Sequence, residues 1–98
     1  MKSLQLKEGH FSIVRSRDGA GDSGPKLRSI NPNTLKSRGK NGQIFVGCCI
    51  ECGSIIARSY QNQDFWLTTP VLEILDVNPE KTQATIKTKN STYLVRSF

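Results

Sequence analysis

The feature that most constrains the fold of this chain is a regular alternation of side chains in its second half. In residues 44–52 every second position carries an apolar or thiol side chain, namely Ile44, Val46, Cys48, Ile50 and Cys52. Residues 82–89 alternate in the same way, with Ala84 on one side and Lys87 on the other. Because a period of two places successive side chains on opposite faces, both segments are predicted to be half-buried strands.

Turn signals between further β-rich segments extend this prediction to the whole of residues 43–98. The clearest is Asn78-Pro79-Glu80-Lys81, whose residue types favour a type I turn. Several short strands separated by turns about every ten residues are typical of an antiparallel meander. We therefore predict an all-β fold that closes into a small barrel or roll of SH3-like or OB-like type. No alternation of strands and helices is present, which excludes a doubly wound nucleotide-binding fold.

The length of 98 residues favours a single domain, in which two other zones precede the core at 43–98. Residues 1–15 are expected to form an N-terminal β-hairpin, with strands at Leu4–Lys7 and Phe11–Arg15. Residues 16–42 contain five glycines, two prolines and few large apolar side chains. Such a segment buries too little apolar area to offset its ordering entropy, so we expect a flexible loop.

The flexible loop also holds most of the net positive charge. The chain has a net charge of +6, and residues 16–42 carry six Lys or Arg against two Asp, which is four of those six charges. Mobile basic arms bind phosphate backbones because each neutralised phosphate releases counterions. The candidate anion-binding side chains of this arm are Arg28, Lys36, Arg38 and Lys40. A short helical turn near Asn33–Lys36, capped by Asn31, is the only regular structure expected there.

A second group of candidates is expected on the β-domain itself. Its basic side chains are Arg58, Lys87 and Lys89, and Trp66 is a candidate for stacking on a base. The alternatives are a solvated basic surface or a basic protein interface for the charges, and core packing for Trp66.

Three cysteines form the other chemical candidate. Cys49 and Cys52 have C-x-x-C spacing followed by glycine, as in a zinc knuckle, and Cys48 adds a third thiol. A second C-x-x-C or a histidine pair is missing, and Cys49 and Cys52 fall on opposite faces of one straight strand. The favoured interpretation is that Cys48 and Cys52 are core residues and Cys49 is a surface thiol. Zinc shared between subunits of a homo-oligomer is the alternative.

The composition disfavours several functional classes. The glycine-rich run at 18–27 has Pro25 where a phosphate-binding loop needs lysine, which excludes nucleotide hydrolysis of that type. One histidine and eight scattered acidic residues supply no catalytic constellation, so we expect a protein that is not an enzyme. No apolar run has the length of a membrane span or a signal peptide. With three thiols, these observations indicate an intracellular, cytoplasmic protein.

The C-terminal third contains Thr68-Thr69-Pro70-Val71, then Ile74, and then the run from Ile86 to Tyr93, which includes Asn90-Ser91-Thr92-Tyr93. In these residues the segment 68–93 resembles the C-terminal segments of small uncharacterised phage and mobile-element β-proteins. The resemblance implies a small viral protein, acting in the cytoplasm of a host cell, that binds nucleic acid or a host protein.

Three hypotheses follow for the function. The leading one is a non-enzymatic binding protein that engages an anionic partner through the basic arm and face; this partner is nucleic acid, a nucleotide-like ligand or an acidic surface of a host protein. The alternative is a protein–protein inhibitor or adaptor that blocks a host protein, with a loop that orders on the partner. The third is the zinc-stabilised homo-oligomer. An exposed strand edge also makes a homodimer without metal reasonable.

Overall fold

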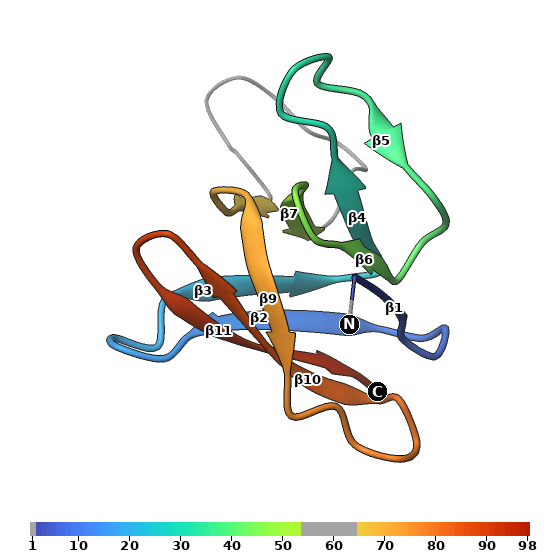
Figure 1. The fold of residues 1–98 in the computed structure, drawn as a ribbon. Coiled ribbons are helices and arrows are strands. Elements are labelled where there is room, and N and C mark those ends of the chain that lie inside the picture. The colour runs from blue at the N-terminus through green and yellow to red at the C-terminus, as the bar shows by residue number, and fades with distance from the viewer. Residues whose placement is uncertain (1, 54–64) are drawn as a thin grey trace.

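The computed structural model describes residues 2–53 and 65–98, and the predicted basic residue Arg58 lies outside them. The described residues form strands and turns without a helix, which confirms the prediction of an all-β fold (Figure 1). None of their elements is therefore a helix that could cross a membrane. The strands are, in chain order, β1 (Ser3–Gln5), β2 (Phe11–Arg15), β3 (Gly21–Gly24), β4 (Lys26–Ile30), β5 (Ser37–Arg38), β6 (Gln43–Phe45), β7 (Cys49–Gly53), β8 (Phe65–Leu67), β9 (Val71–Leu75), β10 (Gln83–Thr88) and β11 (Thr92–Ser97).

These strands form three antiparallel sheets. The largest has the order β3-β2-β11-β10-β9, the second β5-β4-β7-β8, and the third pairs β1 with β6. In the part of the chain that the structure describes, the sheets do not join into the closed barrel that the sequence predicted. On the edge of β9 away from β10, the backbone hydrogen bonds found among the described residues are those of Val71, whose N–H donates to Cys48 O and whose carbonyl accepts from Gly47 N–H. The rest of that edge of β9 has no strand partner among the described residues.

A single apolar core lies between the sheets. It takes side chains from both halves of the chain, and the largest of its fully buried apolar members are Leu6, Phe11, Ile13, Leu27, Ile44, Ile50, Val71, Ile86 and Val95. The strongly alternating strand β10 contributes Ala84 and Ile86 to the core, as its period predicted.

The N-terminal hairpin predicted for residues 1–15 is wrong. β1 pairs with β6 in the register Leu4 to Ile44, and β2 pairs with β3 and β11 instead of β1. The chain bends at Glu8-Gly9, but this bend separates two strands that enter different sheets. The reason is burial: Leu4 faces the core opposite Ile44, and the long-range pairing covers both side chains.

The flexible loop predicted for residues 16–42 is wrong as well. This segment contains β3, β4 and β5, and β4 is an inner strand that pairs with β7 along its whole length. Although apolar residues are few here, two of the three large ones, Leu27 and Ile30, are buried. Asn41 fixes the segment further, since its side chain accepts from Leu27 N–H and donates to Pro25 O. The backbone hydrogen bonds between β4 and β7 and these side-chain contacts offset the entropy that residues 16–42 lose when they become ordered.

The single straight strand predicted for 44–52 is divided into β6 and β7. Cys48 N–H donates to Phe45 O at 3.2 Å, which closes a turn, and Gly47 adopts a φ of 94°. A φ in this range suits glycine, so the chain reverses direction at the one residue of the run that permits it at little cost. The alternation marked Ile44, Cys48, Ile50 and Cys52 correctly as buried, but Val46 is half-buried and Glu51 is also buried. It also gave no sign of the change of sheet.

Candidate nucleic-acid interface

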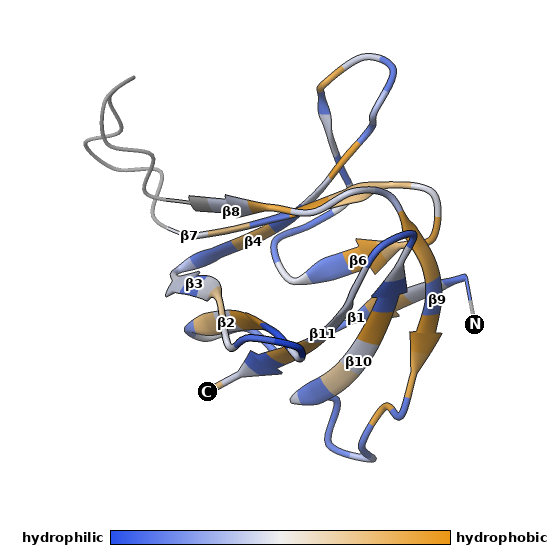
Figure 2. Ribbon diagram, turned by 90° about the vertical axis from the view of Figure 1, so that its left-hand side faces the viewer, coloured by the Kyte–Doolittle hydropathy of each residue, from blue (hydrophilic) through white to orange (hydrophobic). Residues whose placement is uncertain are grey.

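The candidate interface is built on the β4–β5 hairpin, which stands clear of the rest of the fold (Figures 1 and 2). Its two strands pair at Ser29 with Arg38 and at Ile30 with Ser37. Residues 32–40 are all exposed, whereas the β4 end of the hairpin is anchored in the core. Local sequence explains the projection, because Ile30 is the last buried residue before a run of polar and charged side chains.

Hydrogen bonds hold the tip of this hairpin in one shape. Leu35 N–H donates to Asn31 O, and Asn31 N–H donates to Lys36 O, each at 2.8 Å. The Asn31 side chain accepts from the N–H groups of Asn33 and Thr34. The cap by Asn31 predicted from the sequence is therefore present, although it closes one tight turn and no helix follows. These bonds also hold Leu35 at a φ of 62°, a conformation that costs a residue other than glycine about 1–2 kcal/mol.

Side-chain contacts also fix β5 and the residues that follow it. The guanidinium of Arg38 lies over the ring of Phe45 at 4.1 Å from its centroid. Gln43 accepts a hydrogen bond from Lys40 N–H through its side-chain oxygen. At the base, Ser29 Oγ donates to Gln43 O and accepts from Phe45 N–H, which ties β4 to β6. The cation–π contact orients the Arg38 charge before any ligand arrives.

The electrostatic character of this region comes from the absence of acidic residues. Residues 23–50 contain five Lys or Arg and no Asp or Glu. Lys36, Arg38 and Lys40 are exposed, and within the described residues none of them takes part in an ion pair. The hairpin therefore presents three unneutralised positive charges on an ordered scaffold.

Arg28, the fourth residue of the predicted arm, behaves differently. It lies on β4 directly opposite Glu51 on β7, and its Nη2 donates to Glu51 Oε1 at 2.6 Å. Glu51 is only 8% exposed, whereas the side chain of Arg28 keeps 32% of its exposure, so the pair lies at the edge of the protein interior. Arg28 thus compensates a buried carboxylate, and the charge it offers to a ligand is smaller than the sequence alone indicated.

The predicted basic face is separate from the hairpin. Lys87 lies on β10 opposite Glu73 of β9, and Lys89 lies in the turn that leads to β11. Both side chains are exposed, but they belong to the five-stranded sheet, whereas the hairpin belongs to the four-stranded sheet. The structure therefore does not bring them together with Lys36, Arg38 and Lys40 into one continuous surface.

Trp66 is half-buried and packs against the core. Arg15 lies over its ring at 5.1 Å from the centroid, and the same guanidinium bonds Asp18 at 2.7 Å. That hydrogen bond, together with one from Ala20 N–H, lowers the pKa of Asp18 to about 2. One face of Trp66 is thus covered by the protein's own arginine. Its indole Nε1 is buried and has no hydrogen-bond partner among the described residues.

The three cysteines lie close in sequence but in different surroundings. Cys48 and Cys52 are buried and Cys49 is half-buried, and all three are free thiols. Burial raises the pKa of Cys52 to about 12, and burial also raises the pKa of Cys49. In the described ranges, no three His, Cys, Asp or Glu side chains gather closely enough to hold a metal ion.

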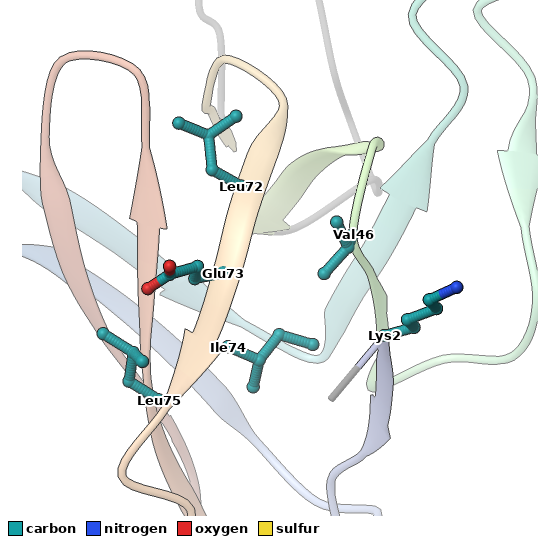
Figure 3. A pocket seen from close by; sticks show the side chains of 6 residues that line it. All are labelled: Lys2, Val46, Leu72, Glu73, Ile74 and Leu75. Atoms are coloured by element: carbon teal, nitrogen blue, oxygen red, sulfur yellow. The ribbon is translucent and has the colours of Figure 1, made fainter.

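A groove with a volume of about 460 Å³ lies beside the open edge of β9 (Figure 3). Leu72, Ile74 and Leu75 line it from β9, and Val46 lines it from the opposite side. Lys2 and Glu73 add one charge of each sign. The groove is therefore mainly apolar and is distinct from the basic hairpin.

Comparisons of the chain with protein-family models, with curated proteins and with solved structures find no match. Only the geometry and charge of the site itself therefore bear on its function.

Two functional features were missed at the level of the sequence. The alternation in residues 44–52 gives Phe45 no role, although its ring supports Arg38. The composition of residues 16–42 gives Leu35 no role either, yet it is 77% exposed at the tip of the hairpin. The signal that could have found Leu35 is its isolation: residues 31–43 contain no other large apolar side chain.

Proposed function

We propose that this protein is a small non-enzymatic binding protein that engages nucleic acid through the β4–β5 hairpin. Lys36, Arg38 and Lys40 neutralise backbone phosphates, and the release of counterions drives association. The observation that carries the proposal is an exposed, hydrogen-bonded hairpin with three unneutralised cations in a stretch free of acidic residues. Its preformed shape lowers the ordering entropy that a flexible arm would lose on binding.

Arg28, Lys87 and Lys89 have smaller roles in this proposal. Arg28 positions β4 through Glu51, and Lys87 and Lys89 add long-range attraction from the other sheet. The setting we propose is the cytoplasm of a host cell, in keeping with the resemblance of residues 68–93 to phage proteins.

The test is the fluorescence anisotropy of a labelled 20-bp duplex titrated with protein at several salt concentrations. Three phosphate contacts predict a slope of about −2.7 for log K against log salt, hence a roughly 40-fold loss of affinity between 50 and 200 mM salt. The variant K36Q/R38Q/K40Q should flatten this slope. The matched control K7Q/R17Q/K81Q removes the same charge from exposed positions outside the hairpin and should keep it. Binding that is independent of salt, or an equal loss in both variants, would refute the proposal.

The groove beside β9 favours a second candidate function, that of a protein inhibitor or adaptor. An open strand edge next to apolar side chains suits an extended peptide that adds a strand to the sheet. In a pull-down from nuclease-treated lysate, such a partner should be retained by the wild type and by K36Q/R38Q/K40Q. It should be lost with Leu72→Asp, which places a charge in the groove. A partner that the nuclease removes would argue against this function.

A further inference from the structure

The tip of the β4–β5 hairpin presents a single apolar side chain. Leu35 is 77% exposed, more than any other large apolar residue in the described ranges. Lys36 follows it directly, and Arg38 lies two residues further on. An isolated exposed leucine is ordinary on a protein surface. Here, however, it lies at the tip of the basic β4–β5 hairpin, where a polar residue would make the protein more soluble.

The backbone conformation of Leu35 is a second indication that this residue has a function. Its φ of 62° lies in the left-handed region, where glycine or asparagine is the usual occupant. The bonds from Leu35 N–H to Asn31 O and from Asn31 N–H to Lys36 O fix this conformation. A large apolar residue at a position that suits glycine is a local conflict, and such conflicts gather at functional sites. The turn is thus one that holds the leucine outward in a defined direction.

We infer that Leu35 is a wedge that inserts between stacked base pairs from the minor groove of double-stranded DNA. Proteins that enter the minor groove use apolar side chains in this way and kink the duplex at the point of insertion. In this arrangement Lys36, Arg38 and Lys40 contact the phosphates beside the kinked step. The inference rests on the proposed function and names both the ligand and the mode of contact.

Charge favours duplex DNA over an apolar pocket on a protein. The residues next to the wedge carry three positive charges and no negative charge, which fits the phosphates that border a minor groove. Duplex RNA fits less well, because its minor groove is wide and shallow and a projecting side chain is not enclosed there.

The test uses a 20-bp duplex with 2-aminopurine at a flexible TA step, since the fluorescence of this base rises when it is unstacked. Saturating wild-type protein should raise the signal, and Leu35→Ala should remove about half of the rise or more. Leu35→Met should restore it. The control Leu67→Ala truncates another exposed leucine, on β8, and should leave the rise unchanged. Because Leu35 is exposed and alanine tolerates its φ no worse, circular dichroism of Leu35→Ala should match the wild type.

Each outcome separates the wedge from the proposed function. If the wild type binds the duplex with the expected salt slope but without a fluorescence rise, or if Leu35→Ala keeps the full rise, the wedge is overturned while nucleic-acid binding stands. If the wild type binds no duplex, the proposed function fails, and the wedge fails with it. If Leu35→Ala instead abolishes capture of a protein that survives nuclease treatment, the tip binds protein and the wedge is overturned.

Discussion

Substitution of Gly21 by alanine tests the pairing of β3 with β2, which lies in the segment that the sequence predicted to be a loop. Gly21 begins β3 and lies opposite Val14 on β2. A Cβ atom at this position would overlap the carbonyl oxygen of Ile13 and lie 2.8 Å from the carbonyl carbon. Gly21 does not have a positive φ, so the cost of the substitution is steric and comes from this close approach.

The expected magnitude follows from what must move. β2 is held on its other side by β11, so β3 has to retreat from β2. Losing about two backbone hydrogen bonds costs about 2 kcal/mol, and residual strain adds about 1 kcal/mol. A loss of about 3 kcal/mol is a large share of the stability of a small domain. It corresponds to a fall in Tm of roughly 10–20 °C.

The assay is urea unfolding followed by the fluorescence of Trp66. Gly47→Ala is the matched control, because no atom lies within 4 Å of the added Cβ and only the φ of 94° is unfavourable. That control should lose about 1 kcal/mol. If Gly21→Ala unfolds at the wild-type midpoint, or loses less stability than Gly47→Ala, the placement of β3 against β2 is refuted.

Three further predictions concern buried and charged groups. Ser29→Ala leaves a carbonyl and an N–H of β6 without their partner, so the free energy of unfolding should fall by about 2 kcal/mol in urea titrations, and no change would contradict the bridge. Because Arg15 lowers the pKa of Asp18 to about 2, the Arg15–Asp18 pair should stabilise the fold fully above about pH 4 and lose this effect as the pH falls to 2. Asp18→Asn should flatten this acid dependence of the unfolding midpoint, and an unaltered profile would count against the pair. At pH 8 a thiol reagent should modify Cys49 faster than Cys52, because Cys52 is buried and its pKa of about 12 keeps it protonated. Mass spectrometry measures the two rates, and equal rates would show that the buried thiol is accessible.

The C-terminal half of the fold could be predicted because its signals are local. Residues 82–89 alternate regularly and only a short turn separates them from the next β-rich segment, so β10 and β11 pair as neighbours in sequence. The pairing of β1 with β6 could not be foreseen in this way, because the choice of partner depends on which long-range contact buries Leu4. The flexible loop predicted for residues 16–42 is wrong because it was based on the number of apolar side chains. The stability of this segment depends instead on the burial of Leu27 and Ile30.

The candidate site was predictable only in its charge. Lys36, Arg38 and Lys40 are visible in the sequence as a basic cluster, and the structure keeps them exposed. The neutralisation of Arg28 required knowledge that Glu51 lies opposite it, and strand register is not encoded in either residue alone.

The position of β11 in the middle of the five-stranded sheet has a consequence for how the protein is made. Its partner β2 ends at Arg15, whereas β11 begins at Thr92, and the Ser97 hydroxyl bonds the Lys7 carbonyl across 90 residues of sequence. At about 5–20 residues per second, a ribosome takes several seconds to supply β11 after β2 has been made. During that interval β2 has an unpaired edge, which is open to other chains. The sheet can be completed only after β11 has been made, so its assembly competes with aggregation on that timescale.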